Sequence, residues 1–247
     1  MIFEAQKEWI CPENFPDLKN YKYIAIDLET RDPDLKIRGS GAIIGNGEIV
    51  GIAVAVDGWS GYYPIAHQGG GNLEKDKVMS WIKDVCSTDS VKLFHNAMYD
   101  VCWLRAAGVH INGHIVDTMV MSSLIDENRL SYTLNSISYE FLGEVKDEKA
   151  LIEAAQSWGI DPKSEMYKLP AMYVGNYAEK DAQLTLELFK VLSREIQKQS
   201  LQNVFDLETQ LFPCLIDMKF KGVRVDIEKA KLLKQQLTRK EQEILLK

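Results

Sequence analysis

The chain has 247 residues, of which 46% are hydrophobic, and a formal net charge of -7. This length and apolar content are sufficient for a soluble globular protein with one large or two small domains. The negative charge argues against a protein that coats nucleic acid through a broad basic surface, since that mode depends on many phosphate contacts, but it is compatible with an enzyme that grips a few nucleotides.

Apolar runs in the first third of the chain predict β-strands. Residues 1–20 have no periodic pattern, so we expect an N-terminal arm, and the run YIAIDLET over residues 23–30 is expected to form a buried strand. Asn46-Gly47 lies between apolar runs and predicts a two-residue hairpin. A further strand at residues 61–65 would complete an antiparallel set of three. His67 follows in a glycine-rich segment, where we expect a loop residue and not a ligand.

From Asn72 the apolar residues recur at helical spacing, and Asn72 is a candidate N-cap. A short strand is expected at residues 91–96 and a helix at residues 97–108. Asp117 is the expected N-cap of the next helix, and Gly143 is expected to close the one that follows. A long amphipathic helix follows at residues 178–199. Hairpin strands followed by a β-α unit and then mostly helices predict an α/β fold, with a mixed β-sheet flanked by helices.

The four cysteines include no C-x-x-C pair, which indicates neither a disulfide framework nor a zinc site. The longest apolar run, residues 49–56, is too short to span a bilayer, and the N-terminus lacks the pattern of a signal peptide. We therefore expect a cytoplasmic protein with no membrane partner.

Two carboxylates end the first predicted strand. Side chains alternate along a strand, so Asp27 and Glu29 should share one face while Leu28 turns into the core. Two interpretations are open. The pair is either a solvated strand end before the turn RDPDL or a site that holds a cation. Considered alone, the eight residues 23–30 favour the solvated strand end, because short motifs have a high false-positive rate.

Three further residues bear on that choice. Asp100 lies in the first turns of the helix after a strand, and Tyr177 and Asp181 are four residues apart on one helix face. Each has a purely structural interpretation when considered alone. Asp100 is then a partner of the helix dipole, Tyr177 a core residue and Asp181 part of a solvated face.

Asp-x-Glu, Asn-x-x-Tyr-Asp and Tyr-x-x-x-Asp occur in this order along the chain. Together they closely resemble the three motifs of the DEDD exonucleases, in the subclass with tyrosine in the third motif. The resemblance covers residues 20–196 and implies a ribonuclease H-like exonuclease fold. It also implies that the catalytic residues are Asp27, Glu29, Asp100, Tyr177 and Asp181.

The resemblance implies two divalent cations, Mg²⁺ or Mn²⁺, which prefer hard oxygen ligands. Asp27 would bridge both ions, and Glu29 and Asp181 would complete the site that holds the nucleophilic water. Asp100 would support the second ion. Tyr177 would orient the water through its hydroxyl, since an ordinary tyrosine pKa near 10 makes it a poor base.

Substrate contacts follow from the same resemblance. Thr30 and Asn96 match positions that contact the terminal nucleotide in the family. Leu35 matches an apolar residue that wedges against the last base, although it lies further from Glu29 than in well-known members. The expected ligand is the 3′ end of single-stranded DNA.

The tail distinguishes between exonuclease classes. Residues 208–226, ETQLFPCLIDMKFKGVRVD, resemble the segment that joins exonuclease and polymerase in family A DNA polymerases of the DNA polymerase I type. We therefore expect a proofreading 3′-5′ exonuclease domain at residues 21–196, of phage type or a stand-alone derivative. Residues 197–247 would form a helical linker toward a polymerase domain. The alternatives are a ribonuclease D-type RNA exonuclease and an inactive nucleic-acid-binding or spacer module.

Overall fold

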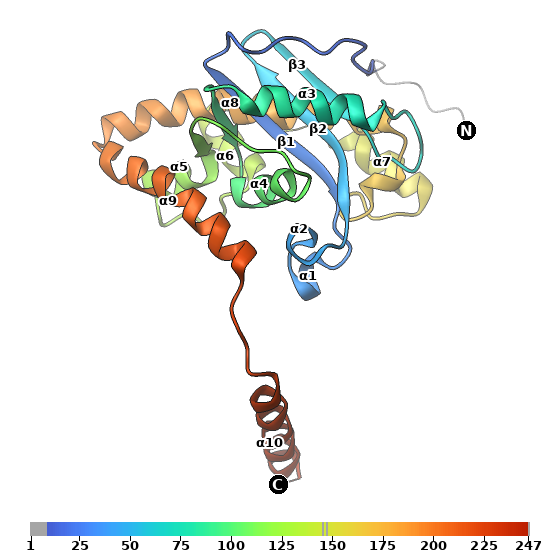
Figure 1. Ribbon diagram of the computed structural model, residues 1–247, viewed down its shortest axis with the longest axis vertical. Coiled ribbons are helices and arrows are strands. Elements are labelled where there is room, and N and C mark those ends of the chain that lie inside the picture. The colour runs from blue at the N-terminus through green and yellow to red at the C-terminus, as the bar shows by residue number, and fades with distance from the viewer. Residues whose placement is uncertain (1–8, 145, 147, 247) are drawn as a thin grey trace. The chain divides into compact units, whose positions relative to one another are not determined.

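The computed structural model describes residues 9–144, 146 and 148–246 (Figure 1). The chain separates into two compact units, one ending at Ile216 and the other beginning at Asp217. The first unit contains the sheet, and the second contains the end of the helix Gln202–Lys221 together with the helix Ile227–Leu245.

The first unit is built on a five-stranded mixed sheet with the order β3-β2-β1-β4-β5. β1 pairs with β2 in antiparallel fashion and with β4 in parallel fashion, while β2–β3 is antiparallel and β4–β5 is parallel. The strands are β1 Tyr23–Arg31, β2 Glu48–Val56, β3 Trp59–Pro64, β4 Val91–Phe94 and β5 Ile115–Asp117.

Helices cover both faces of the sheet, and the predicted α/β fold is confirmed. Figure 1 shows α3 and α4 in front of the sheet and α8 behind it. The helices of this layer arrangement are α3 Lys75–Ser87, α4 Ala97–Ala106, α5 Thr118–Ile125, α6 Leu134–Leu142, α7 Lys149–Trp158 and α8 Gly175–Lys198. The shorter elements are α1 Leu35–Arg38, α2 Gly41–Ile44 and the 3₁₀ turns Met166–Lys168 and Ala171–Tyr173.

Small residues let α8 approach the sheet closely. Ala25 of β1 and Ala53 of β2 are fully buried in the same apolar cluster as Ala178 and Ala182 of α8. Alanine side chains leave little volume between a helix and a strand, so the two backbones come near each other. This packing places Asp181, which lies between these alanines on α8, close to Asp27 and Glu29 of β1.

The hairpin prediction at Asn46-Gly47 was wrong. Residues 41–44 form α2, and the turn between β2 and β3 is made by Asp57-Gly58 instead. The antiparallel set of three therefore consists of β1, β2 and β3. The Asn46 amide donates to Asp34 at 2.9 Å, and Gly47, at φ 125°, packs against the Arg31 carbonyl. Tertiary contacts thus override the local turn signal.

Asn72 is not an N-cap, because α3 begins at Lys75. Its side chain instead accepts from the His67 N–H and donates to the His67 carbonyl, both at 2.7 Å. His67 lies in a loop as predicted, and it is buried between the Tyr62 hydroxyl and the Leu169 carbonyl. The caps at Asp117 and Gly143 are confirmed, since Asp117 accepts from the Met119 N–H and Gly143 ends α6 in a left-handed conformation.

The chain continues after α8 into α9, Gln202–Lys221, and α10, Ile227–Leu245. Leu201 and Phe205 pack against the core cluster of the first unit, and Phe212 and Ile216 are buried. α10 has no buried residue among those described. No helix in the described ranges is long and apolar enough to cross a membrane. The functional boundary expected at residue 197 stays a prediction.

Candidate active site

Asp27 and Glu29 lie on one face of β1, as the alternation predicts, and Leu28 is buried on the other. Their partners across β2 are Ala53 and Gly51, which are too small to cover the carboxylates. A β-bulge follows Glu29, and such irregularities re-aim side chains. Because a Cβ on Gly51 would lie 2.1 Å from a tyrosine hydroxyl, this position requires glycine.

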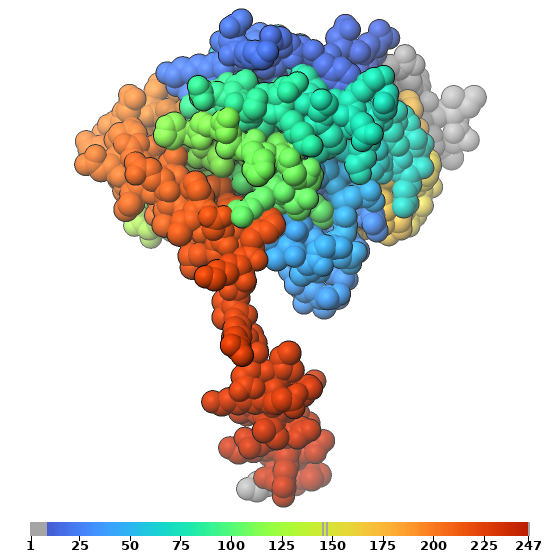
Figure 2. All heavy atoms as spheres, in the orientation of Figure 1, coloured from blue at the N-terminus to red at the C-terminus, as the bar shows by residue number. Residues whose placement is uncertain are grey.

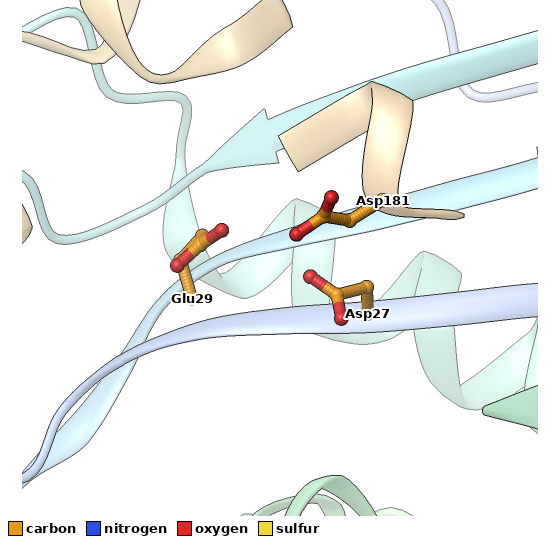
Figure 3. A group of neighbouring side chains, drawn as sticks. All are labelled: Asp27, Glu29 and Asp181. Atoms are coloured by element: carbon orange, nitrogen blue, oxygen red, sulfur yellow. The ribbon is translucent and has the colours of Figure 1, made fainter. Parts of the chain in front are cut away.

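Asp181 joins this pair from α8. Figure 3 shows its carboxylate pointing toward those of Asp27 and Glu29 across the space between helix and strand. One oxygen from each of the three residues lies within 4.8 Å of the other two. Asp181 is only 5% exposed, and its Oδ1 has no hydrogen-bond partner in the described part of the chain. The solvated-face interpretation of Asp181 is therefore wrong.

Asp100 lies beside this group but outside it. It is 4% exposed in the first turn of α4, and its Oδ1 accepts from the Leu28 N–H at 3.0 Å. The nearby charge of Asp27 raises its pKa in addition to the effect of burial. Asp100 thus anchors α4 to β1 while keeping a carboxylate next to Asp27.

Tyr177 lies one helical turn before Asp181 and is half-buried. The Lys146 ammonium lies 3.4 Å from its hydroxyl and 2.5 Å from Asp181 Oδ2. The side chain of Lys146 is 8% exposed. Sequence reasoning missed Lys146, since it follows the glycine that ends α6 and belongs to no motif or periodic pattern.

Burial dominates the electrostatics of the cluster. It raises the pKa of Asp27 to about 6 and that of Asp181 to about 7, while the charge of Lys146 opposes both shifts. Burial and the neighbouring carboxylates raise the pKa of Glu29 well above its ordinary value. Perturbed groups of this kind concentrate at functional sites.

The donor set fits a hard divalent cation. Mg²⁺ and Mn²⁺ prefer carboxylate oxygens and keep several waters, so that a few carboxylates suffice. No described residue forms a hydrogen bond with the buried Asp181 Oδ1, so this oxygen is available to a cation.

The three substrate candidates lie near the end of β1, at the start of α4 and on α1. The Thr30 hydroxyl is 2.6 Å from the hydroxyl of Tyr99, a residue of the second motif that sequence reasoning did not single out. Asn96 is exposed at the start of α4, in a left-handed conformation, with its N–H donating to Asp117. Leu35 lies on α1 and is 43% exposed. α1 and α2 protrude from the first unit in Figure 2.

A cleft of about 290 Å³ opens beside the carboxylates. Glu29, Tyr177 and Lys146 line one part of it, and the rest of the wall includes Glu148 and Lys163. The cluster is therefore reachable from solvent through Glu29, since Asp27 and Glu29 are half-buried and Asp181 alone of the three is buried.

Comparisons with known proteins agree with this geometry. A family model described as 3'-5' exonuclease, of A-type DNA polymerases, matches residues 11–197. A DNA-directed DNA polymerase of Pseudomonas phage M6 is 37% identical over 98% of this chain and 37% of its own length. DNA polymerase DpoZ of Salmonella phage PMBT28 is 31% identical over 87% of this chain and 33% of its own. The chain thus spans about a third of the length of these relatives.

The fold also has solved counterparts. NrnC of Brucella melitensis, in a structure with bound Mg²⁺, matches with a TM-score of 0.58 and 18% identity, covering 84% of this chain and 90% of that one. This likeness shows a shared fold. Because the family model covers most of the chain, this protein belongs to the 3′-5′ exonuclease domains of family A DNA polymerases.

Proposed function

We propose that the site removes nucleotides from the 3′ end of single-stranded DNA and releases nucleoside 5′-monophosphates, as the proofreading part of a family A polymerase. One observation carries the proposal: three carboxylates from β1 and α8 converge within 4.8 Å in a chain of this family. An inactive binding or spacer module would not need to keep such a group together.

The role proposed for each residue comes from the family motifs and agrees with its position. Two Mg²⁺ or Mn²⁺ ions, held by Asp27, Glu29, Asp100 and Asp181, would supply a hydroxide nucleophile and stabilise charge on the phosphate. Asp27 interacts electrostatically with both Asp100 and Asp181, which suits the bridging position. Burial and the charge of Asp181 raise the pKa of Tyr177, so its hydroxyl stays protonated and orients water as a hydrogen-bond partner.

Thr30, Asn96 and Leu35 are proposed to bind the terminal nucleotide. The contact between Thr30 and Tyr99 fixes the backbone next to Glu29, where a terminal sugar would approach. The exposed Leu35 side chain on α1 is available to stack on a base. These assignments come from the family motifs and stay predictions.

The partner is proposed to be a polymerase domain, because the relatives are polymerases about three times as long as this chain. A ribonuclease D-type activity is not better supported, since the sequence relatives are DNA polymerases. The cytoplasmic location stays a prediction from the sequence.

The test is digestion of single-stranded DNA labelled at either the 3′ or the 5′ end, with Mg²⁺ or with excess EDTA. Immediate release of the 3′ label as a mononucleotide, only with Mg²⁺, is expected, together with a ladder from the 5′-labelled strand. Digestion of an RNA strand of the same sequence tests the alternative, a ribonuclease D-type RNA exonuclease. Cleavage of closed circular DNA, or undiminished activity in EDTA, would contradict the proposal.

A further inference from the structure

Lys146 is a buried cation inside the carboxylate cluster. Its side chain is 8% exposed and that of Asp181 is 7% exposed, with Nζ to Oδ2 at 2.5 Å. The ammonium also lies 4.6 Å from the centroid of the Tyr177 ring. Lysine is almost never this buried unless it is paired, so the carboxylates hold the side chain in place.

The charge of Lys146 reaches beyond Asp181. It acts favourably on both Asp27 and Glu29, so one ammonium serves all three carboxylates of the cluster. At a separation of 2.5 Å, no ion fits between Nζ and Oδ2. A metal that takes Asp181 Oδ2 as a ligand, alone or together with Oδ1, therefore requires the ammonium to move.

We infer that Lys146 is a tethered counter-cation of the metal-free site, which competes with divalent metal for Asp181 and is displaced when metal binds. The inference rests on the proposed function, because it presumes that Asp181 is a metal ligand. The lysine stabilises three carboxylates that would otherwise repel one another, and it sets the metal concentration at which the exonuclease becomes active.

The structure offers the displaced side chain a second position. Lys146 and Glu148 line the same cleft beside the cluster. The Glu148 carboxylate accepts a hydrogen bond from Asn135 at 3.1 Å, which holds it at the cleft wall. An ammonium that leaves Asp181 can thus find a carboxylate without becoming buried and unpaired.

The test measures binding of Mn²⁺ alone, by titration calorimetry and by the electron paramagnetic resonance signal of free Mn²⁺. Lys146→Met should bind Mn²⁺ about tenfold more tightly than wild type, because no ion pair has to be broken first. Lys146→Arg keeps the charge and should stay within about threefold of wild type. Lys190→Met is the matched control, since Lys190 lies on α8 but pairs with Asp57 and Glu187 outside the cluster.

Melting in EDTA gives a readout that does not depend on activity. Lys146→Met should lower the Tm of the metal-free protein, since it leaves buried carboxylates without a counter-charge, and added Mn²⁺ should raise its Tm by more than that of wild type. If that variant does not fold, Lys146→Gln replaces it in the same measurements.

The outcomes separate the two proposals. Equal or weaker Mn²⁺ binding by folded Lys146→Met or Lys146→Gln than by wild type would overturn the competitor role and leave the exonuclease proposal intact. A wild-type chain that binds no Mn²⁺ would overturn both, because there would be no metal site for Lys146 to compete at.

Discussion

Replacing Asp181 by asparagine should separate stability from activity. The substitution keeps the shape of the side chain and removes the charge and one metal ligand. Asp181 is buried, its Oδ2 pairs with Lys146, and its Oδ1 has no partner among the described residues. Burial outweighs the attraction of Lys146, so the ionised carboxylate is disfavoured in the metal-free protein. Asp181→Asn should therefore make the metal-free protein more stable and the enzyme inactive.

The magnitude follows from the pKa of Asp181. Burial raises it from an ordinary 3.8 to about 7, so the folded state binds this proton more tightly than the unfolded chain does. The stability that this proton provides is fully present below about pH 4 and is lost as the pH rises through 7. The difference between the folded and unfolded pKa values of Asp181 corresponds to about 4 kcal/mol of folding free energy at pH 8. The attraction of Lys146 is already included, because Lys146 lowers this pKa.

Asparagine imitates the protonated carboxyl, so Asp181→Asn should exceed wild type by up to about 4 kcal/mol in EDTA at pH 8. The gain should shrink toward pH 4, where the wild-type carboxyl is protonated as well. Saturating Mg²⁺ should stabilise wild type more than the variant. Turnover of the variant should be lower by ~10³-fold or more, since the metal supplies both nucleophile and charge stabilisation.

Urea unfolding at pH 8 and pH 4, with EDTA or Mg²⁺, measures the first effect, and release of a 3′ label measures the second. Asp84→Asn is the control, because Asp84 is exposed on α3. A variant less stable than wild type in EDTA at pH 8 would refute the electrostatic reasoning. A near-wild-type rate would show that Asp181 is not a ligand.

Three further expectations concern the same unit. Tyr177→Phe should lower turnover on the order of 10²-fold with little change in oligonucleotide binding, and an unchanged rate would assign Tyr177 to the core. Because the metal-free pKa values of Asp27 and Asp181 are about 6 and 7, Mg²⁺ must displace protons. Its affinity in calorimetry should therefore fall from pH 8 to pH 5.5, and a flat profile would contradict this. A chain ending at Ile216 should melt at the same temperature as the full chain, and its exonuclease rate should stay within a few-fold. A chain ending at Gln197 should have a lower Tm, because the apolar contacts of α9 are lost.

The strand half of the site could be predicted from the sequence because its signal is local. Alternation along β1 places Asp27 and Glu29 on one face whatever the rest of the chain does. The same holds for Tyr177 and Asp181, whose spacing sets them on one face of α8. That β1 and α8 meet was inferred from the family resemblance, since no local pattern relates residues 150 positions apart.

Other features depend on contacts that a local pattern does not contain. Asn46-Gly47 has the residue types of a hairpin turn. Asn46 instead forms a hydrogen bond with Asp34, and Gly47 packs against Arg31, so the segment connects α2 to β2. Lys146 is similar. Nothing in the segment between α6 and α7 indicates that its lysine enters the carboxylate cluster, because that outcome depends on the charge of the cluster.

The packing that assembles the site for catalysis lowers the stability of the metal-free protein. Ala25 of β1 and Ala178 of α8 let the helix lie close to the strand, and this proximity both aligns the carboxylates and shields them from water. Loss of water raises the pKa of each acid, so the cluster is least stable in the ionised form that a metal requires. A cation resolves this conflict. Lys146 offsets the charge in the metal-free protein, and because an ammonium binds carboxylates less strongly than a divalent ion does, it can leave when metal arrives.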